Sequence, residues 1–100
     1  MPSIRVSLSH ALDPAEAMRR LRQRYDSVKA AYQAHVSDLE EAWDHDSVSC
    51  RFRALGQQFQ GTLKAEPGEV RIDMEVPLMA MIFRGTIESR VREELGKLLA

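Results

Sequence analysis

Three consecutive segments between residues 48 and 76 alternate apolar and polar side chains, and this pattern restricts the fold more than any other feature. A period of two is typical of a strand that buries one face. Gly56 separates the first two segments, and Glu66-Pro67-Gly68-Glu69 separates the second from the third. Because turns this short join antiparallel neighbours, we predict an antiparallel sheet over these residues. The expected inner face carries Val48, Cys50, Phe52, Ala54, Phe59, Gly61, Leu63, Ala65, Val70, Ile72, Met74 and Val76.

Two of these inner positions support narrower expectations. Gly61 lies within a strand, which indicates a bulge or close packing of a helix. Cys50 is expected to be buried and unreactive, because a free cysteine among apolar neighbours has a raised pKa.

Two more strands and two helices are predicted outside this region. Residues 4–8 alternate in the same way, and residues 37–43 form a shorter strand in which Glu41 would share a face with Leu39 and Trp43. Asp13 and Pro14 fit the start of a helix ending near residue 34, with Glu16 placed for a capping box. Its apolar stripe is Met18, Leu21, Tyr25, Val28 and Tyr32. A second helix is predicted over residues 78–98, with an apolar seam of Ala80, Phe83, Ile87, Val91, Leu95 and Leu98.

These elements give the order βαββββα in a single domain of residues 1–100. We predict an α+β two-layer sandwich, in which a mainly antiparallel sheet carries both helices on one face. One hundred residues suit one small domain and exclude a full dinucleotide-binding fold or an eightfold barrel.

Composition narrows the class of protein. The chain is 44% hydrophobic with a net charge of −1, which is typical of a folded domain and does not favour a nucleic-acid binder. The one cysteine cannot form an internal disulfide, which fits a reducing cytoplasm. We expect no targeting segment, because the apolar residues of residues 1–12 alternate with polar ones and form no continuous run. We expect no membrane span, because the most apolar stretch, residues 76–83, is too short.

Several short pieces, taken in order, resemble the polyhydroxyalkanoic acid system family, small bacterial proteins encoded near polyhydroxyalkanoate granule genes. The resemblance covers nearly the whole chain and rests mostly on core and turn positions. The pieces are His10-Ala11-Leu12, Ala15, Ala17, Trp43, Phe52, Gly61, Val70-Arg71-Ile72, Pro77-Leu78, Gly85-Thr86-Ile87-Glu88 and Leu95. The family commonly has a glycine after the tryptophan, where this chain has Asp44-His45-Asp46. The resemblance implies a bacterial cytoplasmic protein linked to storage-polyester granules, with no catalytic residues to carry over.

Candidate catalytic and metal-binding residues are few. Asp44-His45-Asp46 is interpreted as a solvated turn, because adjacent residues rarely point at one ion. His10 is expected to form hydrogen bonds where the first strand meets the first helix. We predict no metal, no cofactor and no catalytic residue. An alternative keeps His10 and Trp43 near the mouth of a ligand pocket between the sheet and the helices.

The outer face of the sheet is expected to carry Arg51, Arg53, Lys64 and Arg71 together with Asp73 and Glu75. Cross-strand ion pairs are favoured there over nucleic-acid binding, because no aromatic residues interleave for base stacking.

The most informative anomaly is an apolar surplus at the start of the second helix. Leu78, Met79 and Ile82 lie away from the predicted seam. One interpretation is that the helix begins late or kinks at Gly85, so that these residues pack inside the protein. The other is a contact surface, since exposed apolar patches mark interaction sites and methionine adapts to irregular partners.

The preferred hypothesis is a non-enzymatic accessory protein that contacts a granule-associated protein or the polyester surface through these residues. The alternatives are a small-ligand carrier or enzyme and a homodimerisation module. The expected location is the cytoplasm, with the granule surface left open.

Overall fold

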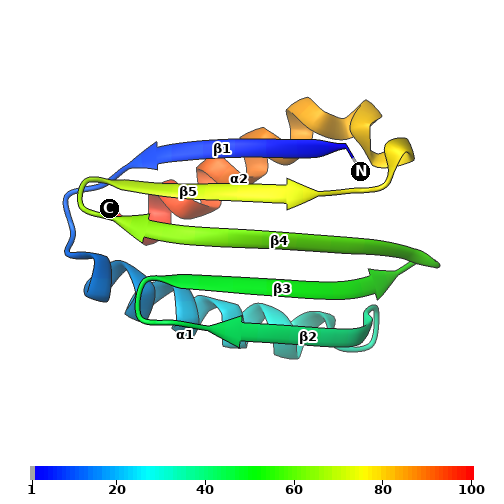
Figure 1. Cartoon of the computed structure of the whole chain (residues 1–100), viewed down its shortest axis with the longest axis horizontal. Coiled ribbons are helices and arrows are strands. Elements are labelled where there is room, and N and C mark those ends of the chain that lie inside the picture. Colours follow the sequence, from blue (N-terminus) through cyan, green and yellow to red (C-terminus); the bar gives the residue numbers. More distant parts are fainter. Residues whose placement is uncertain (1) are drawn as a thin grey trace.

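The computed structural model describes residues 2–100 and contains one five-stranded antiparallel sheet in the order β1-β5-β4-β3-β2. The strands are β1 (Ser3–Ser9), β2 (Ser37–Trp43), β3 (Ser47–Ala54), β4 (Gln57–Glu66) and β5 (Glu69–Glu75). The helices are α1 (Pro14–Tyr32), the 3₁₀-helix η1 (Leu78–Phe83) and α2 (Arg84–Leu98). Figure 1 shows α1 and α2 on the same side of the sheet, so the predicted two-layer α+β architecture is confirmed.

The register confirms the predicted inner face of the central strands. Cys50 lies opposite Gly61, and Gly61 lies opposite Met74, so these alternate positions share one side of the sheet. The predicted bulge or close helix contact at Gly61 is wrong, because the pairing there is regular. A Cβ added at Gly61 would meet only sheet atoms, the nearest at 3.5 Å. The irregularity lies in β2 instead, between Ser37 and Glu40.

Two tight turns have the backbone conformations that their sequences require. In the β3–β4 turn, Leu55 and Gly56 both have positive φ, 54° and 73°. This is the pattern of the two-residue hairpin turn that matches the twist of its strands. In the β4–β5 turn, Gly68 has a φ of 82° directly after Pro67, as the predicted turn demands.

The core is concentrated where the helices converge. One buried cluster joins α1, α2 and the adjoining ends of β4 and β5. It contains Ala17, Met18, Leu21, Ala65, Val70, Leu95 and Leu99. A second cluster, Ile4, Val6 and Val76, lies under η1 and the first turns of α2.

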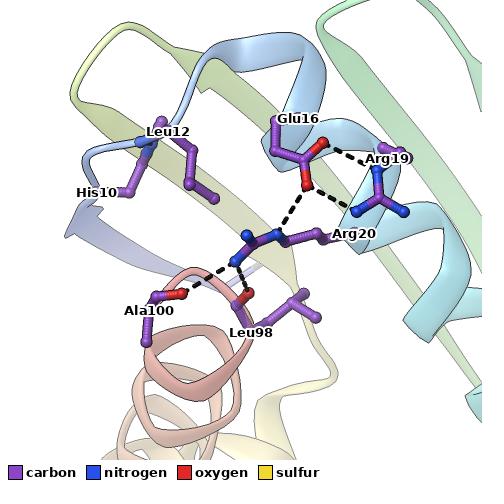
Figure 2. Close-up of polar contacts among 7 residues, drawn as sticks. All are labelled: His10, Leu12, Glu16, Arg19, Arg20, Leu98 and Ala100. Atoms are coloured by element: carbon purple, nitrogen blue, oxygen red, sulfur yellow. Dashed lines mark hydrogen bonds and ion pairs between the residues drawn. The ribbon is translucent and has the colours of Figure 1, made fainter.

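The first turn of α1 differs from the predicted capping box. Pro14 begins the helix, but the side chain of Asp13 makes no capping hydrogen bond. Glu16 instead pairs with Arg19 at 2.7 Å and with Arg20 at 3.0 Å. Figure 2 shows Arg20 continuing to the carbonyl oxygens of Leu98, at 3.1 Å, and Ala100, at 3.0 Å. These contacts join the start of α1 to the last residue of α2 and to Ala100 beyond it.

The predicted second helix is wrong over its first six residues. Residues 78–83 form η1, and the α-helix begins only at Arg84. Phe83, assigned to the buried seam, is 58% exposed. Leu99, which lies beyond the predicted helix, is buried.

Candidate functional site

The large apolar side chains that remain exposed gather at one end of the molecule. Among residues 2–100 they belong to three segments, namely the end of α1, the β3–β4 turn and η1. The side chains are Val28, Tyr32, Leu55, Leu78, Met79, Ile82 and Phe83. Figure 1 shows these three segments toward the same end of the sheet, where the two helices diverge. Exposed apolar groups brought together in this way make this end the candidate interaction site.

The first part of this end is the η1 patch, defined here as Leu78, Met79, Ile82 and Phe83. Leu78, Met79 and Ile82 are 76%, 73% and 80% exposed. The expectation that a late helix start would bury them is wrong. The helix does start late, but only Ala80 and Met81 of η1 pack against the core. The fold therefore leaves the three predicted residues available.

The second part is the lateral groove, a hollow of about 590 Å³ between the second half of α1 and the strands β2 and β3. Its walls include Val28, Tyr32, Leu39, Cys50, Phe52 and Leu55. The groove exists because α1 buries only the first half of its predicted stripe. Met18 and Leu21 are buried, whereas Val28 is 39% exposed and Tyr32 is 58% exposed.

A polar cluster closes the inner end of the groove. The Glu41 carboxylate accepts hydrogen bonds from Tyr25 Oη at 2.9 Å, Lys29 Nζ at 3.1 Å and Trp43 Nε1 at 3.2 Å. Trp43 also packs edge-on against Tyr25, and the guanidinium of Arg22 lies over its ring. Glu41 does share the inner face, as its spacing predicted, and three donors make that placement tolerable.

This cluster is poorly suited to acid–base catalysis. The hydrogen bonds from Lys29 and Tyr25 lower the pKa of Glu41, which makes it a weaker base. Burial, and then the bond to Glu41, raise the pKa of Tyr25. A general acid or base that works at neutral pH needs a pKa close to 7, and both of these pKa values are shifted away from 7. The cluster instead fastens α1 to β2.

Cys50 is half-buried and borders the lateral groove, so the expectation of full burial is wrong. Burial, and then the charge of Glu41, raise the pKa of its thiol. Its low reactivity remains a prediction.

The two residues of the alternative ligand pocket lie in different surroundings. His10 Nε2 lies 2.9 Å from the carbonyl oxygen of Glu66, and its Nδ1 accepts the Leu12 N–H at 3.0 Å. The hydrogen bonds predicted at this junction are therefore present. Trp43 borders a hollow between α1 and α2 whose lining does not include His10.

The turn Asp44-His45-Asp46 is more convergent than expected. Three potential ligand atoms lie within 4.8 Å of one another, and His45 Nδ1 is 3.0 Å from Asp44 Oδ1. Both flanking carboxylates face the histidine ring, and the turn is largely exposed. This arrangement is also that of an ordinary solvated acidic turn.

The outer face of the sheet confirms part of the predicted ion pairing. Arg51 pairs with Glu40, Arg71 pairs with Glu66, and Arg5 pairs with Asp73 at 2.8 Å. Among the residues that the structure describes, Arg53 and Lys64 have no acidic partner within 4 Å.

Together these observations define a small α+β protein with an apolar end. A scan of family profiles matches residues 4–99 to the family described as "Putative polyhydroxyalkanoic acid system protein". The chain belongs to this family, as the short pieces quoted above predicted. Searches of curated proteins and of solved structures found no match. Within residues 2–100, no helix is both long and apolar enough to cross a membrane.

Proposed function

We propose that this protein is a non-catalytic accessory component of the polyhydroxyalkanoate system that binds the polyester surface of storage granules through the η1 patch. The observation that carries this proposal is the exposure of Leu78, Met79 and Ile82, at 73% or more each. Family membership supplies the granule context.

The chemistry of the patch favours a polymer surface over a specific protein partner. Residues 76–83 read Val-Pro-Leu-Met-Ala-Met-Ile-Phe, and none of these side chains can form a strong hydrogen bond. Protein interfaces typically combine an apolar centre with a polar rim and several direct hydrogen bonds. A polyester surface is mainly apolar and irregular, and flexible methionine side chains suit such a surface.

The energy available is enough for reversible attachment. Full burial of one large apolar side chain contributes about 1.5–3 kcal/mol, so several in one patch can offset the entropy lost on attachment. Under this proposal the protein is located at the granule surface and exchanges with the surrounding solution.

Co-sedimentation with protein-free polyester particles and with native granules tests this proposal. The variant Leu78→Gln/Ile82→Gln should lose binding to both. The control Leu55→Gln removes an even more exposed leucine outside the patch and should bind like the wild type.

Three results would overturn the proposal. Wild-type levels of binding by the double variant would exclude the patch. Binding to native granules alone would point to a granule protein instead of the polymer. A wild-type dimer that the double variant disrupts, without binding to particles, would make the patch a self-association surface.

A further inference from the structure

The lateral groove is separate from the η1 patch and has the features of a built binding site. Its volume of about 590 Å³ falls within the range of pockets that hold small molecules, roughly 300–1,000 Å³. Phe52 forms part of its floor and is stacked on Phe59, with ring centroids 5.4 Å apart. The floor is therefore a supported surface beneath the helix.

Leu55, at the rim of the groove, has a backbone conformation that leucine rarely adopts. Its φ of 54° lies in the left-handed region, which costs an ordinary side chain about 1–2 kcal/mol, and asparagine or glycine usually occupies such positions. The side chain is also 97% exposed, so its burial does not offset this cost. The Leu55 side chain extends the wall of the groove and does not pack in the core.

A smaller polar hollow of about 220 Å³ continues the groove around the end of the sheet. The two hollows share His35, Val36, Ala54 and Leu55, and Arg53 lines the smaller one. We call this smaller hollow the basic hollow.

The nitrogen-bearing side chains that line the two hollows are all basic. Among the described residues, Lys29, His35 and Arg53 are their only ionisable side chains apart from Tyr25, Tyr32 and Cys50, and no carboxylate lines either hollow. Lys29 is already paired with Glu41 at 3.1 Å. The Arg53 side chain donates one long hydrogen bond, to the Gly56 carbonyl oxygen at 3.4 Å. Its guanidinium therefore has donors left to bind an anion.

We infer that the lateral groove and the basic hollow together bind a single-chain aliphatic carboxylate. The hydrocarbon chain lies between α1 and β3, against Val28 and Phe52. The carboxylate lies beside Arg53 and the ring of His35, where a guanidinium forms charge-assisted hydrogen bonds. This inference goes beyond the proposed function and uses none of the η1 residues.

The test is an NMR titration of the whole isotope-labelled chain with octanoate and with octan-1-ol, which has the same chain length without the charge. Both probes should shift amide signals of residues 25–36 and 50–56 saturably. Octanoate should bind about fivefold more tightly, which is the upper range for one exposed ion pair.

Two variants and two controls separate the parts of the site. Arg53→Met should reduce octanoate affinity to that of octan-1-ol, whereas Lys64→Met, which removes another unpaired cation of the same sheet face, should change nothing. Val28→Gln should weaken both probes, because it places a polar group in the groove wall. The Leu78→Gln/Ile82→Gln variant should bind octanoate normally, so a failure of the proposed function is distinguishable from a failure here.

Shifts confined to residues 76–84, or no saturable shift at all, would overturn the inference. Equal affinities for acid and alcohol, or an unaffected Arg53→Met variant, would show that the basic hollow does not bind the carboxylate.

Discussion

Glu16 influences the contact between the two helices through Arg20, which pairs with Glu16 and also reaches the carbonyl oxygens of Leu98 and Ala100. Hydrogen bonds from Arg19 and Arg20 lower its pKa from 4.5 to about 2 (Figure 2). A carboxylate whose pKa is depressed by folding stabilises the native state above its unfolded pKa. That contribution is lost as the pH falls through the folded pKa.

We therefore expect wild-type protein to exceed Glu16→Gln in stability at pH 7 and to lose this advantage between about pH 4.5 and pH 2. Urea unfolding across that range measures the difference. An advantage that is the same at pH 2 and pH 7 would contradict the assignment.

Leu55 lowers the stability of the fold because its backbone has a positive φ. Leu55→Asn should raise the free energy of unfolding by about 1 kcal/mol, because asparagine tolerates positive φ. Leu55→Ala is the control, since alanine removes the exposed side chain and keeps the backbone penalty. Thermal melts of the two variants should differ, and equal gains would show that the backbone is not the cause.

Among the contacts between elements, Glu41 of β2 holds the second half of α1 against the sheet through Tyr25 and Lys29. Glu41→Gln removes the charge that Lys29 and Tyr25 bind. Amide hydrogen exchange should then become faster over residues 25–32 and stay unchanged over residues 17–21, which the core holds.

Glu40→Gln is the matched control, because the adjacent glutamate faces the other side of the sheet and pairs with Arg51. Equal effects of Glu40→Gln and Glu41→Gln on α1 would contradict the role given to Glu41.

The strands were predictable because alternation reports directly which face is buried. The pairing of β3, β4 and β5 and both turns follow from the apolar period and from Gly56, Pro67 and Gly68. The irregular pairing of β2 was not predictable, because residues 37–43 do not alternate strictly. The donors that hold Glu41 lie on α1, beyond the reach of any local pattern.

The prediction for the start of the second helix was wrong for a different reason. Apolar residues at 80, 83 and 87 have helical spacing, and a 3₁₀ turn followed by an α-helix satisfies much of the same pattern. The exposure of Leu78, Met79 and Ile82 was anticipated as one of two alternatives. The lateral groove was not, because nothing local shows that α1 leaves Val28 and Tyr32 uncovered.

The whole molecule has two unlike ends. At one end α1 and α2 converge over the main core cluster, and Arg20 joins them. At the other end the helices diverge and carry the exposed apolar residues (Figure 1). A sheet and two helices can be stable with this asymmetry because the end where the helices converge contains most of the buried hydrophobic residues.

The fold does not require the exposed apolar side chains of η1. Two methionines in the same turn test it most directly, because Met79 is 73% exposed and Met81 packs against the second core cluster. Urea unfolding should show Met79→Gln within about 0.5 kcal/mol of wild type. Met81→Gln should lower the free energy of unfolding by roughly 1–2 kcal/mol. A loss for Met79→Gln as large as that for Met81→Gln would contradict the claim and place Met79 in the core.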